Sequence, residues 1–320
     1  MRPRWWEWPQ ALSLEAPLVA WLWLQALAEV HQVWMPAAVS WGLVLAVWWI
    51  YGVDRLLDGW RTARRGSVPP TARHATHWRC RRWLLVGVLP MVTGALVWLG
   101  LWRVPEGLMW KAALVAGLAV FYLVLYVPLW RGPLMEVGLV LAAVMMLELA
   151  RKLPVEPADL FVAGVVVVIL LLSLFLRHFS REDRMPVPKE VVGGLLFALG
   201  VCGGVDFYGG ALPLDTLQLA ALFGMNLLVI SLAEAETEAE TARLRQWLVA
   251  GWIGVIVIHG IVGRMMGGET VPREVLWGVG VGAGLMALLL PLRRVIPVSA
   301  TRTLADAAVV IAALVTWWLG

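Results

Sequence analysis

The stretch from Pro36 to Val53 reads PAAVSWGLVLAVWWIYGV and contains no charged residue. A helix needs about 20 consecutive apolar residues to cross a bilayer. The stretch lacks the strict alternation of apolar and polar residues that indicates a strand. It therefore predicts a transmembrane helix. Asp54 and Asp58 follow directly, so this helix is expected to end in two carboxylates.

Apolar runs of the same kind recur along the whole chain. Hydrophobic residues make up 61% of the 320 residues and charged residues 15%, whereas soluble domains contain about 45–50% and about 25%. This composition excludes an ordinary soluble domain. It predicts an all-α, polytopic helical membrane protein with nine to eleven transmembrane helices in a single domain over residues 1–320. The candidate runs are 16–30, 36–53, 83–102, 108–129, 134–149, 159–178, 190–206, 214–233, 247–263, 274–291 and 303–319.

The net charge of +4 is interpreted as a sign of membrane orientation, and no nucleic-acid partner is expected. If all the runs span, most of the 26 Lys and Arg residues fall on the side of the N-terminus, which the positive-inside rule makes cytoplasmic. We therefore expect an integral protein of a bacterial-type inner membrane, with the N-terminus and the acidic motifs cytoplasmic and the C-terminus outside. The two cysteines, Cys80 and Cys202, fit no metal or redox spacing.

The first candidate site is the carboxylate pair after residue 53. Asp54 and Asp58 are four residues apart, so on a helix they face the same way. Two carboxylates at the membrane edge repel each other, and a hard divalent cation between them would relieve that repulsion. The alternative is a simple helix end, at which the carboxylates pair with Arg55, Arg61 or the lipid interface.

A basic stretch adjoins this pair, between residues 61 and 82. Arginine side chains suit the oxygens of a diphosphate, which makes Arg61 and Arg73 candidate ligands. His74 and His77 could bind zinc, but two histidines without a cysteine partner are a weak signal. The alternative is topological, since positive residues hold a loop inside and contact anionic lipid.

A second acidic group follows the run 214–233. Glu234 and Glu238 are expected to share one helical face, with Asn226 upstream. The alternative is a solvated acidic helix. Six runs separate the two acidic groups, and an even number brings both to one membrane face. Lys189 lies on that face too, as a phosphate contact or an interfacial anchor. Carboxylates and cations above apolar walls suit a metal-bound allylic diphosphate, whose ionisation such a pocket would favour.

Several segments together give the sequence a resemblance to the UbiA-type intramembrane prenyltransferases. VDRLLD at 53–58 resembles the later part of the family's Asn-Asp-x-x-Asp-x-x-x-Asp motif, and 226–238 occupies the place of its second acidic motif. PKEVVGG at 188–194, with FALG at 197–200, resembles the entry to the family's fifth helix. The resemblance implies nine helices around a central lipid-lined cavity. It also implies Mg²⁺-dependent transfer of an isoprenoid chain from a prenyl diphosphate to a hydrophobic acceptor, lipid or aromatic.

The family's motif also assigns roles to residues of this chain. The family's leading Asn-Asp pair falls on Ile50 and Tyr51, and two extra runs between the motifs suggest a hairpin inserted within 108–178. A non-catalytic lipid-binding or assembly protein on the same scaffold is therefore the alternative, and a secondary transporter is a third reading. The implied roles are catalysis by Asp54, Asp58 and Lys189; magnesium binding by Asp54, Asp58, Glu234 and Glu238; diphosphate binding by Arg61, Arg73 and Lys189; and supporting roles for His74, His77 and Asn226.

Overall fold

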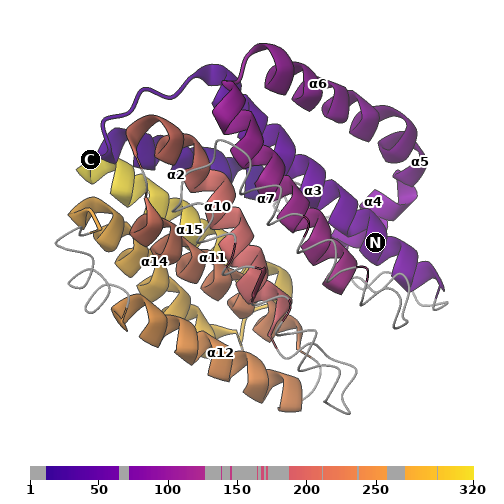
Figure 1. Ribbon diagram of the computed structural model, residues 1–320. Coiled ribbons are helices and arrows are strands. Elements are labelled where there is room, and N and C mark those ends of the chain that lie inside the picture. The colour runs from indigo at the N-terminus through magenta and orange to yellow at the C-terminus, as the bar shows by residue number, and fades with distance from the viewer. Residues whose placement is uncertain are drawn as a thin grey trace.

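The computed structural model describes residues 12–64, 72–126, 187–210, 212–235, 238–257, 271–293 and 295–320, with single positions between 138 and 171. These residues form helices and no strand (Figure 1). The predicted runs 134–149 and 159–178, and most of the possible hairpin, lie outside the described residues. The helices are α2 (Glu15–Val30), α3 (Ala37–Arg64), α4 (Ala72–Arg79), α5 (Arg81–Trp83), the π-helical turn η2 (Leu84–Val88), α6 (Leu89–Trp102), α7 (Glu106–Tyr126), α10 (Lys189–Gly209), α11 (Pro213–Glu234), α12 (Glu238–Val257), α14 (Arg273–Leu292) and α15 (Val298–Leu319).

Among the described residues, 7 helical segments are long and apolar enough to cross a membrane. The prediction of an all-α polytopic membrane protein is confirmed to that extent, whereas the count of nine to eleven and the central cavity stay predictions. α2, with 16 residues, and α12, with charged residues in its first turns, are not among the seven. The seven are Ala37–Trp60, Arg81–Trp102, Glu106–Tyr126, Lys189–Gly209, Leu214–Glu234, Arg273–Leu292 and Val298–Leu319.

Helix α2 packs along one face against α3, α10 and α15. Trp23, Leu24 and Leu27 on it are almost completely buried, whereas Leu18 is 50% exposed and Trp21 38% exposed. The helix therefore has one face packed on the bundle and an apolar face on the outside. The packed face explains how a segment of only 16 residues is retained in the bundle.

Small residues set the distance between the most closely packed helices. A methyl group on Gly194 of α10 would lie 2.4 Å from the backbone nitrogen of Gly224 on α11. A methyl group on Gly278 of α14 would lie 2.6 Å from the carbonyl oxygen of Ala312 on α15. Glycine lets helix backbones approach closely, and this kind of packing is typical of helices in membranes.

The helices alternate in direction, which gives the bundle two ends. The motif end holds the ends of α3, α7, α11 and α14 and the beginnings of α2, α10, α12 and α15. The guanidinium of Arg293, which follows α14, donates to the carbonyl of Leu232 on α11 at 2.8 Å, and Ser231 of α11 donates to Glu190 of α10 at 2.6 Å. At the distal end, Gly320 lies against Val30 of α2.

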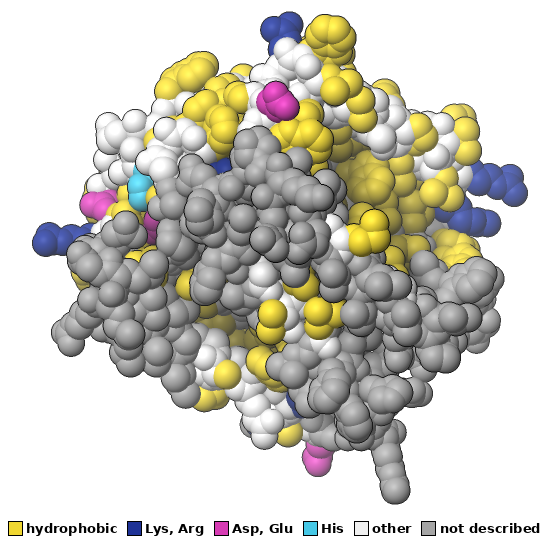
Figure 2. Space-filling view, in the orientation of Figure 1, with side chains coloured by type: hydrophobic (Ala, Val, Ile, Leu, Met, Phe, Trp, Pro, Cys, Tyr) yellow, Lys and Arg dark blue, Asp and Glu magenta, His cyan; other side chains and the backbone are white. Residues whose placement is uncertain are grey.

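The outer surface of the bundle is apolar. Val86, Met91 and Leu101, in the span that contains α6, are more than half exposed, and Figure 2 shows broad hydrophobic areas with most of the charged side chains near the margins of the view. Exposed tryptophans such as Trp102 and Trp318 stand at helix ends, where an aromatic belt meets the lipid headgroups. A surface of this kind needs lipid around it, since soluble monomers rarely expose such large apolar patches.

Candidate functional site

The first acidic pair lies on one helix, as predicted. Asp54 and Asp58 both belong to α3 (Ala37–Arg64), and a spacing of four residues puts them on one face. Oδ2 of Asp54 is 3.9 Å from Nη1 of Arg55, whose side chain is buried. Arg61 continues α3 by one further turn, but its side chain lies outside the described atoms. The guanidinium of Arg55 is therefore a cation close to the first carboxylate of the pair, Asp54.

The second acidic group is built differently from the prediction. α11 ends at Glu234, Ala235 has an extended backbone with φ −62° and ψ 126°, and Glu238 begins α12. The expectation that Glu234 and Glu238 share one helical face is therefore wrong. The carboxylate of Glu234 contacts the buried guanidinium of Arg302 on α15, whereas Glu238 is exposed. An arginine, and not a second carboxylate, is the neighbour of Glu234.

Asn226 lies deeper in α11 and faces α15. Its amide nitrogen donates to Oδ1 of Asp306 at 3.2 Å, and its buried amide oxygen has no hydrogen-bond partner among the described residues. Asp306 was not among the predicted site residues. The available signal was an ionisable residue inside the apolar run 303–319, which in a membrane protein points to a functional or paired group.

The basic stretch forms α4, which packs on the end of α3. Arg73 and His74 belong to this helix, but their side chains lie outside the described atoms. His77 is buried, and its Nε2 lies 3.5 Å from Oγ of Ser13. His77 therefore forms part of the contact between α4 and Ser13, which lies just before α2. Its ring does not face an open diphosphate site.

Helix α10 begins with a lysine and a glutamate at the motif end. Lys189 is its first residue and is exposed, which suits either of the predicted roles. Glu190, which was not singled out, is buried and accepts the hydrogen bond from Ser231 of α11. The burial of Glu190 cannot be predicted from the sequence, because neighbouring positions on a helix point in different directions and packing decides which one is buried.

Two tyrosines lie between these groups. Tyr51 of α3 interacts electrostatically with Asp54 and Asp306, and Tyr122 of α7 interacts with Asp54 and Glu190. Groups from α3, α7, α10 and α15 therefore converge at the motif end. We call Tyr51, Asp54, Tyr122, Glu190, Asn226 and Asp306 the polar cluster.

Of the residues predicted to bind magnesium, Asp54 and Asp58 on α3 remain suited to that role. No group of three or more His, Cys, Asp or Glu side chains within the described part of the chain is arranged to hold a metal ion. Magnesium is usually bound through one or two carboxylates, with waters and substrate phosphates as its other ligands. Asp54 and Asp58 supply such a pair, and Glu234 does not add to it because it contacts Arg302.

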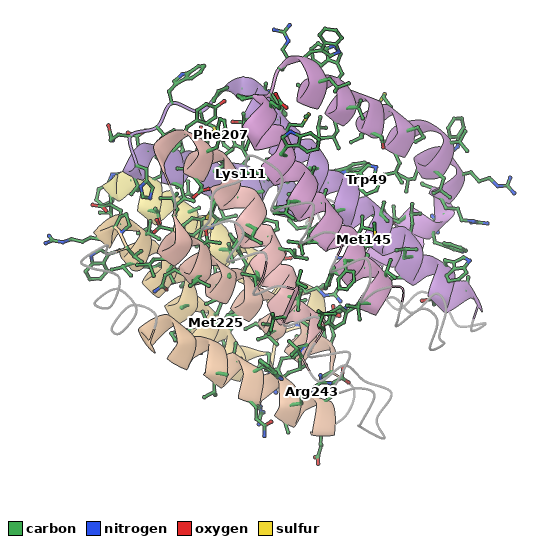
Figure 3. All side chains as sticks on the ribbon, viewed as in Figure 1. Trp49, Lys111, Met145, Phe207, Met225 and Arg243 are labelled. Carbon is green, nitrogen blue, oxygen red and sulfur yellow. The ribbon has the colours of Figure 1, made fainter. Side chains whose placement is uncertain are left out.

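The distal end has contacts of its own between polar side chains of different helices. Nζ of Lys111 on α7 lies 2.5 Å from Oδ2 of Asp206 on α10, with both side chains buried, and Figure 3 shows Lys111 beside Phe207. Nε2 of His31 lies 3.1 Å from Oδ2 of Asp215. These pairs join helices at the end away from the polar cluster.

Comparisons of the chain with protein-family models, with curated proteins and with solved structures give no match.

Proposed function

We propose that the protein binds a prenyl diphosphate at the motif end and transfers its isoprenoid chain to a hydrophobic acceptor, lipid or aromatic, within the membrane. The observation that carries the proposal is the convergence of ionisable groups from distant parts of the chain at one end of an apolar bundle. Asp54 and Glu190 both interact electrostatically with Tyr122. Asn226 donates a hydrogen bond to Asp306. Ionisable residues are costly at membrane depth and are mostly kept for function.

The proposal gives each group a task. Asp54 and Asp58 would hold Mg²⁺, which would neutralise charge on the departing diphosphate when bound. Lys189, Arg61 and Arg73 would bind the diphosphate oxygens, since cations at the helix ends reach the headgroup level.

Other predicted residues keep smaller parts in the proposal. His74, on α4, stays a supporting candidate, and Asn226 would orient Asp306 through the hydrogen bond between them. We leave Glu234 and Glu238 out of the metal set, because Glu234 contacts Arg302 and Glu238 begins another helix. The apolar helices would enclose the isoprenoid chain and keep water from the reacting carbon.

The test is consumption of labelled farnesyl or geranylgeranyl diphosphate by membranes that contain the protein. Asp58→Asn is the test variant, and Glu29→Gln, which alters an exposed carboxylate near the end of α2 at the distal end, is its matched control. We expect magnesium-dependent consumption by the wild type and the control, and a loss of about 100-fold or more in Asp58→Asn, because metal-bound charge stabilisation is worth several kcal/mol. Equal turnover in the two variants would remove Asp58 from the metal site.

The contact between Glu234 and Arg302 favours a second candidate, a lipid-diphosphate binding protein without transferase activity. The carboxylate is neutralised by a buried guanidinium, so it is poorly placed to bind a second cation. Magnesium-dependent binding of a non-hydrolysable prenyl diphosphate analogue, together with no consumption of the natural donor, would support this function over transfer.

We also propose that the motif end and the N-terminus face the cytoplasm of a bacterial-type inner membrane and that the C-terminus lies outside. The excess of Lys and Arg on the side of the N-terminus supports this orientation. Arg79, at the end of α4, and Arg81 and Arg82, in α5, would then contact the anionic cytoplasmic leaflet.

A further inference from the structure

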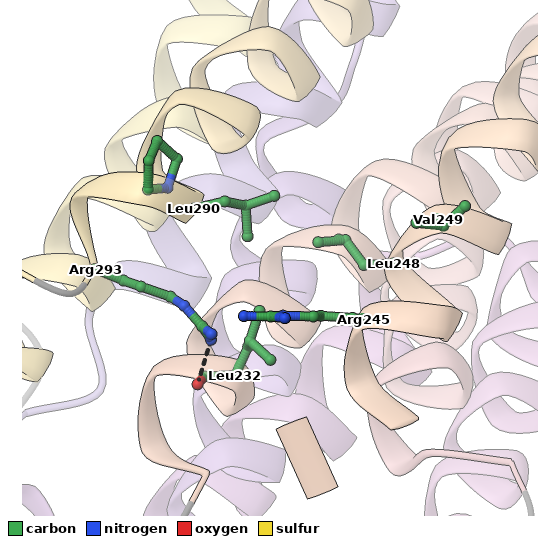
Figure 4. Close-up of a pocket in the computed structure, with 7 residues that line it drawn as sticks. Leu232, Arg245, Leu248, Val249, Leu290 and Arg293 are labelled. Atoms are coloured by element: carbon green, nitrogen blue, oxygen red, sulfur yellow. Dashed lines mark hydrogen bonds between the residues drawn. The ribbon is translucent and has the colours of Figure 1, made fainter. Parts of the chain in front are cut away.

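A pocket opens between α11, α12 and α14, away from the polar cluster. Its volume is about 470 Å³, within the usual range for small-molecule sites. Each of the three helices supplies part of its wall (Figure 4). The lining residues are Leu232, Arg245, Leu248, Val249, Leu290, Pro291 and Arg293.

The charged residues in the described lining of this pocket are two arginines. Figure 4 shows the side chains of Arg245, from α12, and Arg293, after α14, reaching toward each other across the pocket. Arg293 donates one hydrogen bond to the carbonyl of Leu232 at 2.8 Å, which fixes its guanidinium at the last turn of α11. Arg245 is exposed, and no hydrogen bond or ion pair ties it to another described residue. An anion bound between the two guanidiniums would be attracted by both of them.

The rest of the wall is apolar. Leu248 and Val249 lie three and four residues after Arg245, so all three side chains share one face of α12. Leu290 faces them from α14 (Figure 4). An anion that fits this pocket therefore carries a hydrocarbon part, which can lie along the leucines while the charged part meets the guanidiniums.

The position of the pocket matches the depth of a lipid headgroup. Leu232 is in the last turn of α11, Arg293 follows the end of α14, and Arg245 lies two turns into α12, at the same level of the bundle. All three lie at the motif end, where the apolar spans give way to polar segments. Basic pockets between transmembrane helices on the cytoplasmic side are typical sites for anionic lipid headgroups.

We propose that this pocket binds an anionic glycerophospholipid. The phosphate lies between Arg245 and Arg293, whose planar donors suit phosphate oxygens, and an acyl chain runs along Leu248 and Leu290. Bound in this way, the lipid links α12 to α14 and α11. None of the described lining residues of the site belongs to the polar cluster, although α11 contributes to both, and the proposal stands whether or not the protein transfers prenyl groups.

The test is a binding titration of the delipidated full-length protein in neutral detergent, followed by native mass spectrometry. Phosphatidylglycerol, phosphatidylcholine and inorganic phosphate are added separately. We compare the wild type with Arg245→Gln, and with Arg273→Gln as the matched control. Arg273 is an exposed arginine at the beginning of α14, at the distal end, and does not line the pocket. Because Arg245 is exposed and makes no bond to other described residues, its replacement is expected to leave the fold intact.

We expect phosphatidylglycerol to bind at least about tenfold more tightly than phosphatidylcholine, because both lipids offer an anionic phosphate but the choline cation of phosphatidylcholine is repelled by the two arginines. Arg245→Gln should remove this preference, and Arg273→Gln should retain it. Equal affinity for the two lipids, or an equal loss in both variants, would overturn the proposal. Saturation of the pocket by inorganic phosphate, with no added affinity from the acyl chains, would overturn the assignment to a lipid.

Discussion

The close approach of α10 and α11 at Gly194 makes a prediction that can be worked through in detail. In Gly194→Ala, the new methyl carbon would stand 2.4 Å from the backbone nitrogen and 2.6 Å from the Cα of Gly224. Side-chain carbons essentially never come within 3.0 Å of such atoms, so the two helices must move apart by at least 0.6 Å. A radial gap of 0.5–1 Å already loses about a quarter to a half of the dispersion attraction between facing atoms.

The expected cost follows from that separation. Overpacking of a well-packed interface usually costs about 1–3 kcal/mol, and here the obstacle is backbone, which cannot turn aside as a side chain can. Alanine is a better helix former than glycine, and this difference stabilises the variant by about 0.5–1 kcal/mol, which offsets part of the cost. We therefore expect Gly194→Ala to be destabilised by about 1–2 kcal/mol.

The control lies on the same helix. A methyl group on Gly203 would meet no atom within 4 Å, so Gly203→Ala should be as stable as the wild type or slightly more stable. The measurement is unfolding of the purified protein in detergent, followed by the fluorescence of its 21 tryptophans. If Gly194→Ala unfolds at or above the temperature of Gly203→Ala, the helices are not held at the distance described.

Three further predictions test other contacts. Gly278→Ala should lower the unfolding temperature for the same reason as Gly194→Ala, since its methyl group would lie 2.6 Å from a carbonyl oxygen of α15. Lys111→Met leaves Asp206 buried without its cation and should cost about 3–5 kcal/mol; combining it with Asp206→Leu should recover most of that loss, and an equal loss in both proteins would show that the charges are not coupled. Cys80 is exposed and Cys202 is buried, so a membrane-impermeant maleimide should label one site, in inverted vesicles but not in intact cells if the motif end is cytoplasmic.

The sequence predicts the helices well because the bilayer sets their length and composition. The uncharged run 36–53 becomes most of α3, and Asp54 and Asp58 stay on that helix, since a four-residue spacing is a local property. The short run 16–30 becomes α2, but its composition does not show that it packs against α3, α10 and α15. Those contacts depend on the tertiary arrangement of the helices.

Contacts between residues that are far apart in the chain could not be predicted from the sequence. The series of acidic residues after Asn226 is compatible with one continuous helix, and the break at Ala235 follows from no residue with a strong turn preference. Glu234 contacts Arg302 because the end of α11 meets the beginning of α15. This contact is a property of the tertiary structure. Asp306 was overlooked for the same reason, since a single acid in an apolar run does not indicate its partner.

The packing of α2 on helices far along the chain has a consequence for biosynthesis. Chains are made from the N-terminus onward, so α2 is made before α10 and α15, which cover its buried face. Until Val298–Leu319 is inserted, part of that face can be shielded only by lipid or by a membrane chaperone. The contact between α2 and α15 therefore forms only after the other described helices have been made.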